Sequence, residues 1–93
     1  MLVGVCRITL RLHGVHSLKE KRSIVKSLVE KIRRQLKVSA AEVDALDQKD
    51  GAVIALAAVS LSEAILRDLF TQAERMAEQA AGAEVIDVNV ELL

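Results

Sequence analysis

Residues 17–36 read SLKEKRSIVKSLVEKIRRQL, and this stretch decides the fold. It opens on a capping-box pattern, in which the Ser17 hydroxyl accepts a hydrogen bond from the backbone N–H of Glu20 and the Glu20 carboxylate reaches back. Apolar residues then recur at the three- and four-residue spacing of an amphipathic helix. The stretch therefore predicts a helix over about residues 18–37 with one apolar face. Its apolar positions are Leu18, Val25, Leu28, Val29, Ile32 and Leu36.

The segment before this helix, residues 2–12, alternates between two sets of side chains, which is typical of a strand with one face in the core. The expected core face runs from Leu2 to Leu12 through the even-numbered residues, and the odd-numbered residues form the other face. Residues 84–92 alternate in the same way and predict a last strand. Its expected inward residues are Ile86, Val88, Val90 and Leu92, and its outward residues are Asp87, Asn89 and Glu91.

Residues 38–59 predict a hairpin. Residues 38–48 are its first strand, and the wholly apolar run from Ala52 to Val59 is typical of a central strand. Asp50 and Gly51 supply the positive φ that a tight two-residue turn needs. With these two residues as the loop, one face pairs Val43 and Ala45 with Ala58 and Leu56, and the other carries Glu42 and Asp44 beside Val59 and Ala57.

A second capping-box pattern, Ser60-Leu61-Ser62-Glu63, starts a second amphipathic helix that we expect to run to about Ala81 and to end at Gly82. The order of elements is therefore β-α-β-β-α-β. Right-handed crossovers then place the first and third strands at the centre of a four-stranded antiparallel sheet, with both helices on one face. We expect an α+β fold of the ferredoxin-like, split β-α-β type, formed by residues 1–93 as one domain.

The composition excludes several classes of protein. No apolar run approaches the roughly 20 residues of a membrane span, and the first strand follows Met1 without the basic region or cleavage site of a targeting segment. The single cysteine, Cys6, forms no internal disulfide, so we expect a reducing, cytoplasmic setting. Phe70 is the one aromatic residue, which excludes aromatic base-stacking platforms and aromatic ligand cages.

The 13 basic and 13 acidic residues cancel, but they are distributed unevenly. Residues 13–37 carry eight basic and two acidic residues, a balance of +6, and the rest of the chain carries −6. At about 100° per residue, five of these basic residues fall within about 60° of the helix circumference. Such a stripe is typical of a surface that binds a polyanion, here RNA or a ribosomal particle, and an ordinary solvated helix face is the alternative. The five are Lys19, Arg22, Lys26, Arg33 and Lys37.

The sheet face away from the helices is the second candidate surface. Its centre carries small apolar side chains, and such a strip is unusual on the exposed face of a monomer. We expect it to pack against a second copy related by a two-fold axis. Its charged rim has an alternative explanation, cross-strand ion pairs of Arg7 and Arg11 with Asp87 and Glu91. The expected interface residues are Val3, Val5, Arg7, Val53, Ala55, Ala57 and Val59.

No combination of residues predicts catalysis, a metal site or a cofactor. His13 and His16 lie three residues apart in a loop that lacks the further ligands a metal needs. Cys6 alternates into the core, where it is expected to act as a small apolar side chain. The alternation of a strand places Asp47 on the opposite face from Glu42 and Asp44, so we expect no shared carboxylate site. The chain also has no glycine-rich phosphate-binding loop. We therefore expect a protein that is not an enzyme.

The motif SLKEKRS at residues 17–23, followed by an apolar and basic helix, resembles the hallmark of the YlxP-like family of small bacterial proteins, domain-of-unknown-function family 503. The resemblance covers the whole chain and implies a ferredoxin-like fold. It also suggests a place near translation, because members are often encoded beside ribosome-maturation and initiation factors. By position, Lys19, Lys21 and Arg22 are the charged motif residues that could serve a partner. Many relatives carry an aromatic residue in the hairpin, and residues 45–51 carry none here, so the hairpin is not an expected contact.

Two functional hypotheses follow. The first is a cytoplasmic accessory protein that binds RNA or ribosomal particles through the basic first helix, without sequence choice. The second is a dimeric module that binds a protein or small molecule through the open sheet face. The expected RNA-binding residues of the first hypothesis are Lys19, Lys21, Arg22, Lys26, Arg33, Arg34 and Lys37.

Overall fold

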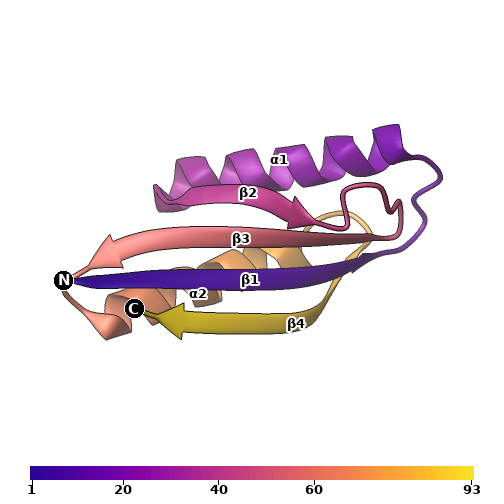
Figure 1. Cartoon of the computed structure of the whole chain (residues 1–93). Helices are drawn as coiled ribbons and strands as arrows, with labels where there is room; N and C mark the ends of the chain where they lie inside the picture. The colour runs from indigo at the N-terminus through magenta and orange to yellow at the C-terminus, as the bar shows by residue number, and fades with distance from the viewer.

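Six elements follow one another in the expected order in the computed structural model, which describes residues 1–93 (Figure 1). The sheet is fully antiparallel with the strand order β2-β3-β1-β4, so the first and third strands are central. The ferredoxin-like, split β-α-β fold is thereby confirmed. The elements are β1 (Leu2–Leu12), α1 (Leu18–Leu36), β2 (Ser39–Asp44), β3 (Gly51–Ser60), α2 (Glu63–Glu78) and β4 (Ala83–Leu92).

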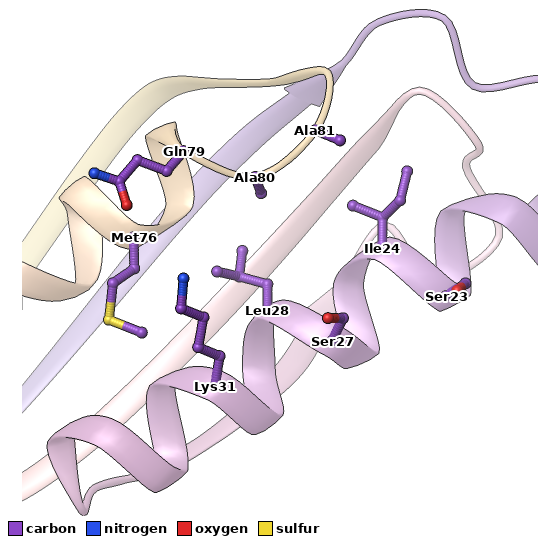
Figure 2. A pocket seen from close by; sticks show the side chains of 9 residues that line it. All are labelled: Ser23, Ile24, Ser27, Leu28, Lys31, Met76, Gln79, Ala80 and Ala81. Carbon is purple, nitrogen blue, oxygen red and sulfur yellow. The ribbon is translucent and has the colours of Figure 1, made fainter.

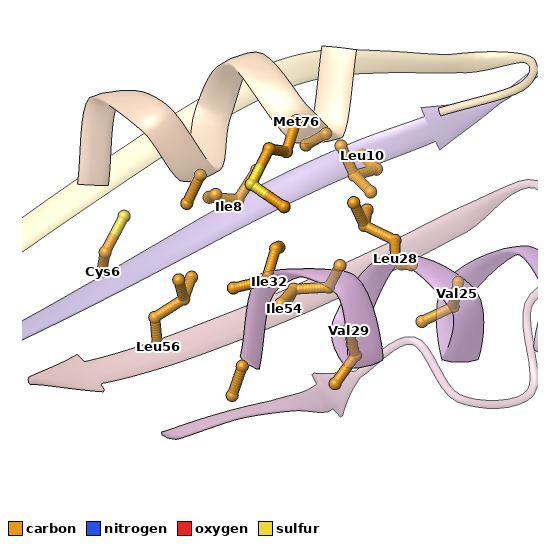
Figure 3. Close-up of a cluster of buried hydrophobic side chains, with 14 of the residues drawn as sticks. Cys6, Ile8, Leu10, Val25, Leu28, Val29, Ile32, Ile54, Leu56 and Met76 are labelled. Carbon is orange, nitrogen blue, oxygen red and sulfur yellow. The ribbon is translucent and has the colours of Figure 1, made fainter. Parts of the chain in front are cut away.

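One hydrophobic core lies between the sheet and the two helices (Figure 3). On β1 the even-numbered residues from Cys6 to Leu12 are buried, as the alternation predicts. Ile54 and Leu56 of β3 lie beside them, and the apolar faces of α1 and α2 pack on top. Because both helices contribute to the same cluster, they cover the same face and leave the other face of the sheet open.

The helix termini follow from local side-chain hydrogen bonds. Ser17 Oγ accepts from the Glu20 N–H at 3.1 Å, as the capping box predicts. In α2 the N-cap is Ser62, which accepts from the Ile65 N–H at 3.3 Å, and Ser60 instead accepts from the Ser62 N–H. That helix ends at Glu78, earlier than expected. Gly82 is therefore not its terminal residue, but lies directly before β4 with φ 72°.

A β-bulge in β4 turns Ile86 outward, so the expectation that its side chain faces the core is wrong. The register of β1 against β4 shifts between Thr9 and Leu10, so that Thr9 pairs with Asp87 and Leu10 with Val85. Ile86 is the extra residue of the bulge and is 46% exposed. Because the bulge reverses the alternation, Val85 takes the inward position expected for Ile86.

The β2–β3 hairpin differs most from the expectation. Asp50 and Gly51 do not form a two-residue turn, since Gly51 begins β3 and residues 45–50 form the loop. Glu42 pairs with Ile54 where Val59 was expected, a shift of five residues. An odd shift exchanges the two faces of a strand, so Glu42 lies on the helix side. A second bulge, between Glu42 and Asp44, then sends these two carboxylates to opposite faces.

Candidate functional site

The basic stripe along α1 is exposed to solvent. Lys19, Arg22, Lys26, Arg33 and Lys37 are all exposed. The first four keep the relative positions that the helical period predicts, and Lys37 follows the last helical residue as a C-cap with φ 54°. The three ion pairs of the structure, His13–Glu84, Lys21–Glu42 and Arg67–Glu63, involve none of them. The sixth exposed candidate, Arg34, lies about 100° around the helix from Arg33. No ion pair within the molecule therefore neutralises the positive charge of this surface, although the chain as a whole carries no net charge.

Arg33 connects the stripe to the edge of the sheet. Its Nε donates a hydrogen bond of 2.8 Å to the carbonyl oxygen of Ala40 in β2. β2 is an edge strand, so this bond occupies a backbone acceptor that the sheet leaves unpaired. The bond fixes the guanidinium beside the edge strand, while its terminal nitrogens stay available to an anion.

Lys21 does not belong to the exposed set, which corrects its expected role as an RNA contact. Its side chain is fully buried, and its Nζ lies 2.7 Å from Ala45 O, 3.3 Å from Leu46 O and 2.7 Å from Glu42 Oε2. The physical reason is helical phase. Lys21 precedes Val25 by four residues and therefore shares its inward face.

The Lys21 ammonium holds the β2–β3 loop in place from inside the molecule. It donates hydrogen bonds to two backbone carbonyls of the loop and forms an ion pair with Glu42, whose Oε2 atom is buried and has no hydrogen-bond partner. Ala45, the first residue of the loop, adopts φ 60°, a left-handed conformation that is unfavourable for a residue with a Cβ. The Lys21 ammonium contacts the carbonyl of this residue and that of Leu46, at the point where the hairpin departs from the expected register.

The open sheet face carries the residues that the alternation predicts. Val3 pairs with Val59, Val5 with Ala57, Arg7 with Ala55 and Thr9 with Val53 across the two central strands. The ion pairs of Arg7 and Arg11 with Asp87 and Glu91, the alternative explanation of the charged rim, are not formed. A hollow of about 400 Å³ lies over the small side chains of β2 and β3. Its apolar walls include Val5, Ala41, Val43, Ala55 and Ala57.

The remaining candidate groups show no catalytic arrangement. No three His, Cys, Asp or Glu side chains come together as a metal ion would need. His13 Nε2 lies 2.8 Å from Glu84 Oε1, and this hydrogen bond holds the pKa of the exposed Glu84 carboxyl below its usual value. Burial raises the pKa of the Cys6 thiol to about 11, so the side chain is a neutral thiol at physiological pH.

Neither helix combines the length and the apolar character that a membrane crossing requires.

Strand order, register and helix placement define a ferredoxin-like α+β protein. The chain belongs to the family described as "Protein of unknown function (DUF503)", which matches it over residues 3–90. No curated protein sequence matches it.

Solved structures with the same fold share little sequence with the chain. A de novo designed protein with ferredoxin fold, LFR1 1, superposes with a TM-score of 0.62 at 11% identity, covering 100% of this chain and 84% of the other. A structural-genomics protein, YJCS, gives a TM-score of 0.55 at 14% identity and covers 96% of both chains. SnoaB, a cofactor-independent oxygenase from Streptomyces nogalater, gives 0.52 at 12% identity over 99% and 90%. At these low identities, the three structures resemble this chain in fold only.

Proposed function

We propose that this protein is a non-enzymatic accessory factor that binds RNA or ribosomal particles through α1. The observation that carries the proposal is the exposed stripe of unpaired basic residues, extended by Arg33 to the edge strand β2. Lysine and arginine side chains that contact phosphates give affinity without reading a base sequence. The phosphate-contacting residues would be Lys19, Arg22, Lys26, Arg33, Arg34 and Lys37.

The same proposal includes a YlxP-like identity, a cytoplasmic location and a place near translation. The SLKEKRS motif supports the first, and the single buried cysteine is compatible with a reducing compartment. Because the open sheet face has no aromatic side chain, a base-stacking mode of RNA recognition is not part of the proposal.

Charge reversal tests the proposal. The triple variant Lys19→Glu, Arg22→Glu and Lys26→Glu reverses three exposed charges that form no ion pair within the protein. We expect its affinity for RNA or ribosomal particles to fall by about 100-fold or more at low salt, and the salt dependence to weaken. For the native protein, log affinity should fall with log salt at a slope of about −4 if roughly five phosphates are contacted. Co-sedimentation over a salt series measures both quantities.

The matched control is the triple variant Lys49→Glu, Arg67→Glu and Arg75→Glu. It changes the net charge by the same amount with residues that are exposed and lie outside α1. If both variants lose the same affinity for RNA or ribosomal particles, net charge alone explains the loss, and a binding site on α1 is excluded. Unchanged binding in the first variant would make the stripe an ordinary solvated surface.

A second candidate function is a dimeric interaction module that uses the open sheet face. The hollow over Ala41, Ala55 and Ala57 supports it, because small apolar side chains give a flat surface that a second copy can cover. The net charge of +0 leaves no overall repulsion between copies. The strands have 11, 6, 10 and 10 residues, so at about 3.3 Å per residue and 4.8 Å between strands the sheet face of one copy covers about 600 Å². A two-fold pair would then bury about 1,200 Å² in total, the lower limit of a specific interface.

An arginine on the open face should separate such a dimer. Ala57→Arg places a long charged side chain in the hollow, and we expect a dimer by light scattering to become a monomer. Ala64→Arg, an exposed alanine on α2, is the control and should leave the mass unchanged. A native protein that is monomeric at micromolar concentration would remove this candidate and leave the RNA proposal untouched.

A further inference from the structure

A groove of about 340 Å³ lies between α1 and the C-terminal end of α2, on the outer side of the helix layer (Figure 2). It exists because the facing side chains are small, with Ser23 and Ser27 on one wall and Ala80 and Ala81 on the other. α2 ends at Glu78, so no further helical turn extends over this space.

The floor of the groove is apolar. Leu28 and Met76 are buried core residues that present one side to it, and Ile24 lies half-buried at its edge. An apolar chain placed in the groove would therefore remove these side chains from water, which is the main source of affinity for such a ligand.

The polar groups around the floor can all donate hydrogen bonds. Figure 2 shows the half-buried Lys31 with its ammonium directed into the groove, between Leu28 and Met76. This ammonium has no ion-pair or hydrogen-bond partner in the structure. The Gln79 amide and the two serine hydroxyls are further donors, and none of the nine lining residues is acidic.

Three of the six backbone carbonyls from Arg75 to Ala80 accept a hydrogen bond, and those of Met76, Glu78 and Gln79 accept none. The Gln79 N–H donates to Arg75 O, the Ala80 N–H to Ala77 O and the Ala83 N–H to Ala80 O. These three carbonyls are therefore already satisfied by the turn that leads into β4.

We propose that this groove binds a small amphipathic anion, a monocarboxylate with an unbranched apolar chain. One ammonium balances one carboxylate, whereas a phosphate monoester carries about −1.5 to −2 at neutral pH and would be left partly unbalanced. If each non-hydrogen atom takes roughly the 30 Å³ that a water molecule occupies, a volume of 340 Å³ holds about eleven of them, enough for the ten of an eight-carbon acid. Lys31 lies about 140° around α1 from Lys26 and about 60° from Arg34, so the groove adjoins one edge of the proposed RNA surface and does not include it.

Octanoate is the probe that tests the proposal, observed by methyl and amide NMR shifts of the uniformly labelled protein. We expect saturable shifts at Ile24, Leu28 and Met76 with a dissociation constant on the order of 1 mM, as a shallow site and a small ligand imply. Octanol has the same chain without the charge and should bind at least about fivefold more weakly. Acetate has the charge without the chain and should give no saturable shifts at these methyl groups.

Two variants and a control locate the site. Lys31→Met keeps the apolar stem and should make octanoate and octanol bind equally, while Lys26→Met should leave octanoate binding unchanged. Ser27→Leu fills the groove and should abolish both. Octanoate binding that is unaffected by Lys31→Met, or shifts centred on another surface, would overturn the proposal. So would equal binding of octanoate and octanol by the native protein. The Lys31→Met result stands by itself if Ser27→Leu does not fold.

Discussion

Replacing Lys21 by methionine should lower the free energy of unfolding by about 3–5 kcal/mol, because one partner of a buried ion pair is removed and the other is left uncompensated. Lys21 is fully buried, and the side chain of Glu42 is only 15% exposed. Two backbone carbonyls, those of Ala45 and Leu46, lose their donor at the same time. For a domain of this size the loss corresponds to a fall in melting temperature of more than about 12 °C.

Thermal and urea denaturation measure this effect against two further variants. Lys26→Met removes an exposed charge from the same helix and should change stability by less than about 0.5 kcal/mol. The double variant Lys21→Met and Glu42→Leu removes both charges, so we expect it to be more stable than Lys21→Met alone. If Lys21→Met denatures at the same temperature as Lys26→Met, the ion pair does not hold the hairpin.

The role of Lys21 changes the interpretation of the SLKEKR motif. Ser17 and Glu20 cap the helix, and Lys21 fixes the loop 24 residues further along the chain. Of the motif's charged residues, only Lys19 and Arg22 are exposed and form no ion pair or side-chain hydrogen bond. The positions that make the motif recognisable are therefore largely explained by folding, and the proposed partner surface depends mainly on residues beyond it.

The fold could be predicted from the sequence because its local signals agree with one another. The alternation of β1, the period of α1 and the capping serines each indicate the same element that the tertiary structure forms. Sheet order then follows from the handedness of the two crossovers. These signals lie within single elements or between neighbouring ones, where a sequence pattern is informative.

The hairpin register and the β4 bulge could not be predicted in this way. Asp50-Gly51 is a strong local turn signal, but the observed loop is longer, and its Ala45 and Leu46 carbonyls accept hydrogen bonds from Lys21, 24 and 25 residues earlier in the chain. A bulge such as the one at Ile86 adds one residue without a characteristic residue type and reverses the alternation beyond it. For Lys21 itself a signal was present, because its spacing from Val25 and Leu28 places it on the inward face. Helical phase excludes Lys21 from the basic stripe, and it entered the expected RNA-binding set only as a charged residue of the family motif.

The single aromatic residue gives the second large expected effect. Phe70 of α2 is 2% exposed, and a Cβ added at Gly4 of β1 would lie 2.9 Å from two of its ring carbons and 3.2 Å from Leu66 Cδ1. The ring therefore packs directly on the backbone of a central strand, at a position where only glycine leaves room for it. Phe70→Ala should lower the free energy of unfolding by about 3–5 kcal/mol, through lost burial and the cavity that remains. Ile65→Ala, at a 56% exposed position on the same helix, is the matched control and should lower it by less than about 0.5 kcal/mol.

A double-mutant cycle shows whether Gly4 and Phe70 act as one packing unit. Gly4→Ala should destabilise by about 1–3 kcal/mol, because the added methyl group displaces the ring. In a Phe70→Leu background the same methyl group meets a smaller side chain, so its effect should fall by about 1 kcal/mol or more. Urea denaturation of the four proteins measures this coupling. Strictly additive losses would mean that the Gly4 methyl group is accommodated by a shift of the strand, with Phe70 merely one of many core residues. A coupling of the expected size would instead show that the glycine of β1 and the one aromatic residue of the chain together fix the position of α2 on the sheet.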